Sequence, residues 1–139
     1  MRYWDSSALV SLLVDEAGSE NRRAVLRQDP GIVTWWGSWV ECAPAVCCLY
    51  REGAIDDAGL EQSLERLAAL AGGWVEVRPL DRIRRRAIRL LRVHPLRAAD
   101  ALQLAAALTA SAEEPADLEV VSSDARLSAA ARREGFAVR

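Results

Sequence analysis

Four acidic residues stand where short apolar stretches end or where predicted helices begin. Asp5 and Asp124 each follow a stretch that is typical of a strand, and Glu41 and Asp100 fall in the first turns of predicted helices. Carboxylates about 4 Å apart repel each other by roughly 4 kcal/mol per pair at an effective dielectric constant near 20. Protonation or a divalent cation relieves this repulsion, and a ligand set made only of oxygen atoms suits Mg²⁺ or Mn²⁺.

Asp100 is the most unusual of these acids because it interrupts a very apolar predicted helix, residues 98–112. A carboxylate in such a stretch needs a partner to offset the cost of leaving water. The type of residue at this position therefore favours a site over a plain surface charge.

The residue types that the chain lacks exclude several other chemistries. All 18 basic residues are arginines, so a Schiff-base lysine and the lysine of a phosphate-binding P-loop are both absent. The single histidine, His94, precedes Pro95 and is interpreted as a turn residue without a catalytic role. The net charge of −2 is not the overall basic character of a protein that binds nucleic acid by charge alone, so any such binding must be local.

The elements that must position the acids alternate between strand-like and helix-like periodicity, which predicts one α/β domain over residues 1–139. We expect strands at residues 2–5, 32–35, 74–78, 119–122 and 136–138. We expect helices at residues 7–17, 19–28, 39–51, 57–71, 98–112 and 125–134, and an arginine-rich helix between Pro79 and His94. The strands should form a parallel sheet covered by helices on both faces, with any ligand beyond the carboxyl ends of the strands.

The cysteines and the N-terminal stretch favour a cytoplasmic location. Cys42, Cys47 and Cys48 are too close together to form a disulfide framework and are interpreted as reduced thiols. The apolar stretch at residues 9–14 is flanked by acids, which is atypical of a signal peptide or a membrane span.

Motifs along the whole chain resemble those of a known family. They are the run at residues 3–10 around Asp5, Glu41 with the Arg51-Glu52-Gly53 end of its helix, residues 97–108 around Asp100, and residues 122–127 around Asp124. Together they resemble the PIN-domain nucleases and, within them, the VapC-type toxins of type II toxin–antitoxin systems.

The resemblance implies a three-layer α/β/α fold, metal-dependent cleavage of RNA, and a small antitoxin as partner. It implies that Asp5, Glu41, Asp100 and Asp124 are the catalytic acids. Asp5, Asp100 and Asp124 would bind Mg²⁺ or Mn²⁺, directly or through water, and Glu41 would help to place the attacking water or a second ion. Ser6 and Ser122 would support the acids as polar neighbours.

Each acid also has a purely structural interpretation. Asp5 and Asp124 could be N-caps of the helices that follow them. Glu41 could form a capping box with Ser38. A buried Asp100 could pair with Arg97 alone.

Pro44 complicates the placement of Glu41. A proline well inside a helix removes a backbone hydrogen bond and costs about 3 kcal/mol. We therefore expect the helix that carries Glu41 to start late or to kink near this residue.

A stretch without acids contains Arg82, Arg84, Arg85, Arg86, Arg89, Arg92 and Arg97. Most of these side chains are expected to form a solvated face over buried Ile83, Ala87, Ile88 and Leu91. Those nearest the acids could hold phosphates, and Arg86 and Arg97 are the candidate RNA contacts.

Two further questions stay open at the level of sequence. Trp35, Trp36 and Trp39 are either core or subunit contacts, which we favour, or stacking surfaces for unpaired bases; with the apolar content and the family resemblance, they predict a homodimer. The alternative functions are a catalytically inactive PIN-like module that binds RNA or protein, and a nuclease that acts on DNA.

Overall fold

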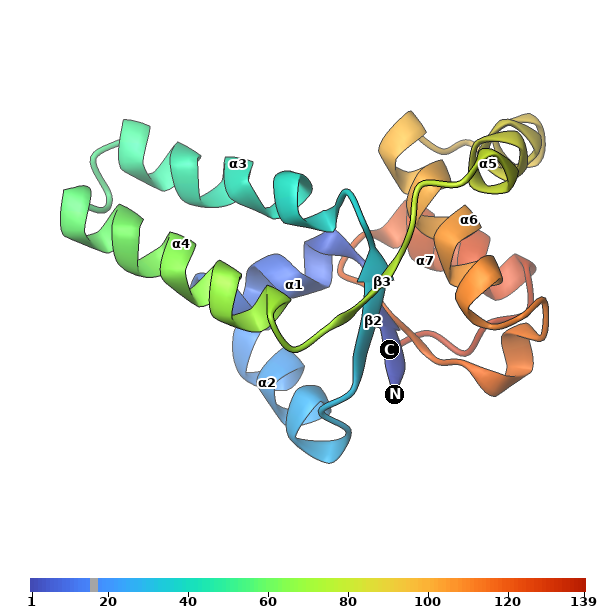
Figure 1. Ribbon diagram of the computed structural model, residues 1–139, viewed down its shortest axis with the longest axis horizontal. Helices are drawn as coiled ribbons and strands as arrows, with labels where there is room; N and C mark the ends of the chain where they lie inside the picture. Colours follow the sequence, from blue (N-terminus) through green and yellow to red (C-terminus); the bar gives the residue numbers. More distant parts are fainter. Residues whose placement is uncertain (16–17) are drawn as a thin grey trace.

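The computed structural model describes residues 1–15 and 18–139, in which short strands alternate with helices (Figure 1). The strands are β1 (Arg2–Trp4), β2 (Ile32–Trp35), β3 (Val75–Val77) and β4 (Val120–Val121). The helices are α1 (Ser6–Leu13), α2 (Ser19–Gln28), α3 (Ser38–Arg51), α4 (Asp57–Ala71), α5 (Asp81–Val93), α6 (Ala98–Ala110) and α7 (Ala125–Arg133), with a 3₁₀ turn at Pro115–Asp117.

All four strands run parallel, in the order β3-β2-β1-β4. In the centre, Tyr3 of β1 pairs with Val33 of β2 on one side and with Val120 of β4 on the other. Parallel strands end at the same edge of a sheet, so the residues that follow β1, β2 and β4 come together there. We refer to this edge as the carboxyl edge.

Each face of the sheet has its own apolar core, because successive side chains of a strand point to opposite faces. Tyr3 and Val33 pack with α5, α6 and α7, whereas Trp4 and Ile32 pack with α1, α2 and α4. Figure 1 shows the strands between these two groups of helices. The predicted three-layer α/β/α fold is therefore confirmed.

Helix α6 lies deepest in the first of these cores. Its buried positions include a run of small side chains at Ala105, Ala106 and Ala107, which lets neighbouring backbone approach closely. This helix carries Asp100 and Gln103, so its packing fixes two polar side chains of the carboxyl edge. Among the described helices, none is both long and apolar enough to cross a bilayer.

Most predicted elements occur, with shifts at their ends. The predicted fifth strand, residues 136–138, is wrong, because its pairing with β4 amounts to a single bridge between Val120 and Val138. The predicted helix at residues 7–17 is shorter than expected, since α1 ends at Leu13 and its C-cap Val14 is extended. Residues 16 and 17 of that prediction lie outside the described part of the chain.

Two expectations about helix faces and breaks are corrected. On α5 the buried residues are Ile83, Ala87 and Leu90, which follow helical spacing, whereas Ile88 (58% exposed) and Leu91 (41% exposed) face outward. Helix α3 does not start late: it begins at Ser38 and continues through Pro44. The carbonyl that loses its donor to this proline belongs to Val40, which lies on the exposed first turn.

Candidate active site

The four predicted acids all lie at helix starts along the carboxyl edge. Asp5 directly follows β1 and is the N-cap of α1, and Asp124 is the N-cap of α7, shortly after β4. Glu41 lies in the first turn of α3, and Asp100 lies in the first turn of α6. Helix N-termini expose unpaired N–H groups and favour negative charge, which makes this edge a stable place for carboxylates.

Asp5 is the most buried acid of the edge, with 1% of its surface exposed. Its Oδ1 accepts hydrogen bonds from the backbone N–H groups of Ser7 (2.5 Å) and Ala8 (3.1 Å), and its Oδ2 accepts one from the hydroxyl of Ser122. The capping interpretation of Asp5 is therefore correct. These hydrogen bonds do not use all the acceptor positions of the carboxylate, of which there are about four.

Burial raises the pKa of the Asp5 carboxyl, and hydrogen bonds from Ser122 and Ser7 offset part of this rise. The pKa of Tyr3 lies well above its ordinary value because the phenol is buried and faces the charges of Asp5 and Glu41. Burial and the same two carboxylates raise the pKa of the Cys42 thiol to about 12. Asp5 and Glu41 thus raise the pKa values of two separate side chains, so the two acids create one region of negative potential.

Glu41 is held by side chains of two other helices. Its Oε2 accepts a hydrogen bond from the hydroxyl of Ser6 at 2.5 Å and one from the amide of Gln103 at 2.8 Å. The alternative of a capping box with Ser38 is wrong, because Ser38 is already the first residue of α3 and its hydroxyl contacts Thr34 and Gln103.

Gln103 organises a buried hydrogen-bond chain. Its Oε1 accepts from the hydroxyl of Tyr3 (2.6 Å), which turns its amide nitrogen toward Glu41 and Ser38. The Thr34 hydroxyl donates its one hydrogen to the carbonyl of Trp4, so Ser38 must donate to Thr34 and accept from Gln103. The amide nitrogen of Gln103 also lies 3.1 Å from the hydroxyl of Ser6, so its two hydrogens have three acceptors within reach.

Asp100 and Asp124 each have a capping contact as well. Oδ2 of Asp100 accepts from the backbone N–H of Arg97 at 3.2 Å, and Oδ1 of Asp124 accepts from that of Leu127 at 2.7 Å. Both residues are half-buried. The alternative in which a buried Asp100 pairs with the Arg97 guanidinium is wrong, since their contact is through the backbone.

The fold places the acids in two sets, Asp5 with Asp124 and Glu41 with Asp100. Ser122 joins Asp5 to Asp124, because its hydroxyl donates to Asp5 and accepts from the backbone N–H of Asp124 (3.1 Å). Asp100 lies one helical turn before Gln103, the partner of Glu41, on the same face of α6. In residues 1–15 and 18–139, no three acidic, histidine or cysteine side chains form a group that could hold one metal ion.

The four acids offer only oxygen atoms, which is the type of ligand that a hard divalent cation prefers. None of the four acids forms an ion pair within the described residues. Burying a carboxylate such as Asp5 without a cation is costly, and a bound ion would offset that cost. Soft ligands do not compete, because the Cys42 thiol stays protonated and His94 ends α5 beside Glu134, at 2.7 Å.

The two arginines predicted to contact RNA lie near opposite ends of α6, although Arg86 itself belongs to α5. Arg97 is the exposed N-cap of α6, at the carboxyl edge. Arg86 donates hydrogen bonds to Thr109 (3.2 Å) and Glu113 near the other end. The fold therefore brings Arg97 to the acids and leaves Arg86 away from them.

Two residues of the edge were missed from the sequence. Gln103 had a readable signal, since it is a polar residue between leucines in the apolar helix, as unusual there as Asp100. Arg22 of α2 donates to the carbonyl of Ser122 at 2.7 Å and to the hydroxyl of Ser123 at 3.3 Å, and so holds the loop after β4. No local pattern could reveal a contact across 100 residues.

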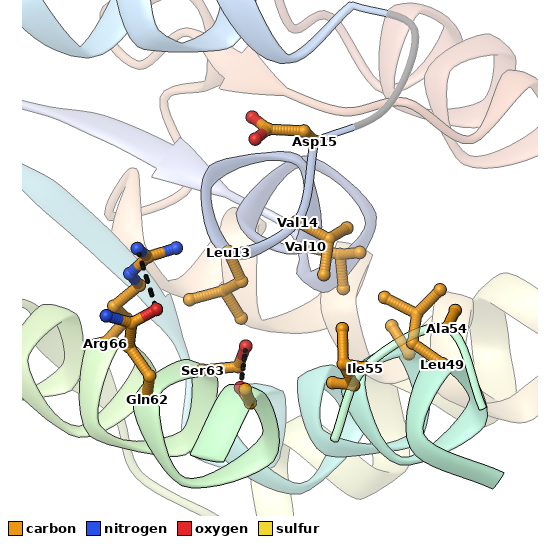
Figure 2. A pocket seen from close by; sticks show the side chains of 12 residues that line it. Val10, Leu13, Val14, Asp15, Leu49, Ala54, Ile55, Gln62, Ser63 and Arg66 are labelled. Atoms are coloured by element: carbon orange, nitrogen blue, oxygen red, sulfur yellow. Dashed lines mark hydrogen bonds between the residues drawn. The ribbon is translucent and has the colours of Figure 1, made fainter. Parts of the chain in front are cut away.

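A hollow lies away from the acids, between α1 and the α3–α4 hairpin (Figure 2). Its volume is about 470 Å³. Figure 2 shows Val10 and Leu13 of α1 facing Leu49 and Ile55 across it, with Arg66 at the rim donating to Gln62. None of the four acids lines this groove, so it is a separate feature of the surface.

Comparison with known proteins gives one family and several similar folds. The family model described as "PIN domain" matches residues 2–133. A toxin–antitoxin complex from Klebsiella pneumoniae has a chain that is 16% identical, with a TM-score of 0.63 over 89% of this chain and 87% of that one. FitAcB from Neisseria gonorrhoeae is 19% identical, with a TM-score of 0.68 over 99% and 96% of the two chains. PAE2754 from Pyrobaculum aerophilum is 18% identical, with a TM-score of 0.63 over 99% and 89%. The search among curated proteins found no match.

Proposed function

Because this chain belongs to the PIN-domain family, we propose that it is a divalent-metal-dependent endoribonuclease, a VapC-type toxin that a small antitoxin holds inactive. The observation that carries the proposal is the buried Asp5 carboxylate, which lies at the carboxyl edge without an ion-pair partner in the described residues. The three acids at neighbouring helix starts support it. RNA as substrate and a cytoplasmic location stay predictions.

In this proposal, Asp5, Asp100 and Asp124 would hold Mg²⁺ or Mn²⁺, directly or through water. A bound ion supplies Lewis-acid chemistry, since it lowers the pKa of a water molecule and offsets negative charge at the phosphate. The protein keeps Asp5 in place through the hydroxyl of Ser122 and the backbone N–H of Ser7. Because these contacts are already made, the carboxylate is oriented before substrate binds.

Glu41 would orient the attacking water. Ser6 and Gln103 both bind its Oε2, and among the described residues no donor binds its Oε1. That oxygen is therefore available to accept a hydrogen from water and align it for attack on phosphorus. The exposed Arg97 guanidinium at the same edge would contact an RNA phosphate.

Metal dependence is tested by melting and by cleavage together. We expect Mn²⁺ at about 100 times its dissociation constant to add about 2.7 kcal/mol of stability, which raises the melting temperature by roughly 10 °C. EDTA should reverse this shift and stop the cleavage of an unstructured RNA, and Mn²⁺ should restore both. Cleavage that persists in EDTA refutes the metal mechanism.

Other outcomes of this test identify the alternatives. No melting shift and no cleavage in Mn²⁺ would indicate a catalytically inactive PIN-like module. Equal cleavage of a single-stranded DNA of the same sequence would indicate a nuclease without preference for RNA.

The antitoxin partner is supported by the similar fold in the Klebsiella pneumoniae toxin–antitoxin complex. An acidic edge that accepts a cation also suits a guanidinium, whose fork of donors matches paired carboxylates. We expect an antitoxin arginine to occupy this edge, so that added Mg²⁺ and Asp100→Asn each weaken antitoxin binding, measured by calorimetry. Arg92→Gln on α5 is the control and should leave binding unchanged. Affinity that ignores both Mg²⁺ and Asp100 would place the inhibitor elsewhere.

We also expect a homodimer. Helix α5 leaves Ile88 and Leu91 exposed, and a second copy could cover such side chains. Light scattering at micromolar concentration should give twice the 15.2 kDa mass of the chain. The mass of a single chain would contradict this prediction.

A further inference from the structure

A second hollow, of about 200 Å³, opens beside the carboxyl edge. Its lining residues come from the ends of β2 and β3 and from α5 and α6: Trp35, Pro79, Leu80, Ile83, Arg84 and Leu102. Leu102 stands between Asp100 and Gln103 in the chain. The first turns of α6 therefore serve both this hollow and the acid site.

The indole of Trp35 connects the hollow to Glu41. A Cβ on Gly37 would lie 2.5 Å from Nε1 of Trp35 and 3.5 Å from Oε1 of Glu41, so both atoms border the same point. Only glycine leaves room for this approach. Within the part of the chain that the structure describes, Nε1 of Trp35 has no hydrogen-bond acceptor, so an unused donor lies between the hollow and the acids.

The lining has the chemistry of a site for a flat ring attached to a phosphate. Apolar side chains and an indole form its walls, and Trp36, 53% exposed, packs edge-on against Trp35. Arg84 supplies a cation at the rim. Its only ion pair among the described residues is with Asp81 at 3.5 Å, between two largely exposed side chains, and such pairs contribute little. The guanidinium therefore remains available to an anion.

The size of the hollow limits what it can hold. Sites for drug-sized ligands measure roughly 300–1,000 Å³. A hollow of about 200 Å³ has room for one ring system, with the attached sugar and phosphate outside.

We propose that this hollow binds one unpaired base of the RNA, next to the phosphate presented to the acids, while Arg84 contacts a neighbouring phosphate. The proposal rests on the proposed nuclease function and adds where a base and a phosphate of the substrate bind. Burial of a base against aromatic and apolar walls tolerates different sequences. The free Nε1–H of Trp35 adds a preference for a base that presents an acceptor at that point.

The test compares two probes in EDTA, so that no cleavage occurs. One is a fluorescein-labelled ten-nucleotide RNA without secondary structure, and the other is the same sugar–phosphate chain with every base removed. Fluorescence anisotropy gives both dissociation constants, and their ratio reports the contribution of the bases. We expect the wild-type protein to bind the RNA roughly tenfold or more tightly than the abasic chain.

Leu80→Trp fills the hollow from its rim, where Leu80 is 44% exposed. This variant should bring the ratio close to one and leave the affinity for the abasic chain unchanged. Tyr50→Trp is the matched control, because Tyr50 is 40% exposed at the far end of α3, and it should keep the wild-type ratio. Arg84→Gln should weaken both probes equally and reduce the salt dependence of binding by about one phosphate contact.

A wild-type ratio near one, or a ratio that Leu80→Trp leaves unchanged, overturns the base-binding site. If Leu80→Trp instead changes the mass in light scattering and not the ratio, the hollow is a contact between copies of the chain and the proposal is wrong. If Leu80→Trp fails to fold, Leu102→Phe fills the same hollow from α6. Cleavage of the RNA in Mn²⁺ is measured separately, so loss of the nuclease function and loss of the base site are distinguishable.

Discussion

Replacing Asp5 by asparagine is expected to reduce metal-dependent RNA cleavage by roughly 10³-fold or more, because a metal ion contributes several kcal/mol to transition-state stabilisation and each 1.36 kcal/mol is a factor of ten. The amide keeps the shape of the side chain and loses the charge that would hold the ion. Its oxygen can still accept from Ser7 and Ala8, and the Ser122 hydroxyl can turn to accept from the new N–H group. The fold should therefore survive.

The variant has a matched control in Asp56→Asn. Asp56 caps α4 by accepting from the N–H of Gly59 at 2.9 Å, and it is not one of the acids of the carboxyl edge. Cleavage of RNA in Mn²⁺ and thermal melting should be measured for both variants. Asp5→Asn should also lose the stabilisation by Mn²⁺, while Asp56→Asn keeps cleavage and metal response. Full activity of Asp5→Asn at saturating Mn²⁺ would rule out its role as a ligand.

Gln103→Leu is expected to produce the largest loss of stability, about 3–5 kcal/mol, because it leaves several buried polar groups without partners. The hydroxyl of Tyr3 loses its acceptor, and Glu41 and Ser38 lose a donor. The melting temperature should fall by roughly 10–20 °C. Thr109→Val, at the other end of α6, is the control and should change stability by less than about 1 kcal/mol. Equal melting temperatures of the two variants would show that the buried hydrogen-bond chain around Gln103 contributes little to stability.

Gln103→Glu should make stability depend on pH in a defined direction. The new carboxyl would stand where an amide now donates to Glu41 at 2.8 Å, and the neighbouring charge raises its pKa in the folded protein above the unfolded value of about 4.3. Below that value the protonated group can still donate to Glu41 and accept from Tyr3. Between that value and the folded pKa, the unfolded state has released this proton while the folded state still holds it, so stability relative to wild type declines as pH rises. A constant difference across pH 4–8 in chemical denaturation would contradict the argument.

The fold could be predicted from the sequence because its signals are local. Alternating periodicity, glycines after helices and acids after apolar stretches all act within a few residues, and the three-layer architecture followed from them. The face that α5 buries was harder to assign, because Ile88 and Leu91 are as apolar as Leu90 and only the packing against α6 decides between them.

The positions of the four acids in the fold could be predicted from the sequence, and the contacts around them could not. Asp5, Glu41, Asp100 and Asp124 do lie at helix starts along one edge, as strand order requires. Their partners come from distant parts of the chain, and no periodicity encodes such contacts. The placement of Arg86 away from that edge likewise depends on how α5 crosses α6, which has no local signature.

The same long separations set the time at which the site can form. Tyr3 and Gln103 are 100 residues apart, and Asp5 and Ser122 are 117 apart. During synthesis at about 5–20 residues per second, β1 and the Asp5 that follows it would wait roughly 5–25 s for α6 and β4 to be made. Until then β1 has no neighbour on one side and Glu41 has no amide donor. A nascent chain therefore carries Asp5 and Glu41 without the rest of the site, and whatever chemistry this edge performs begins only after β4 has been made.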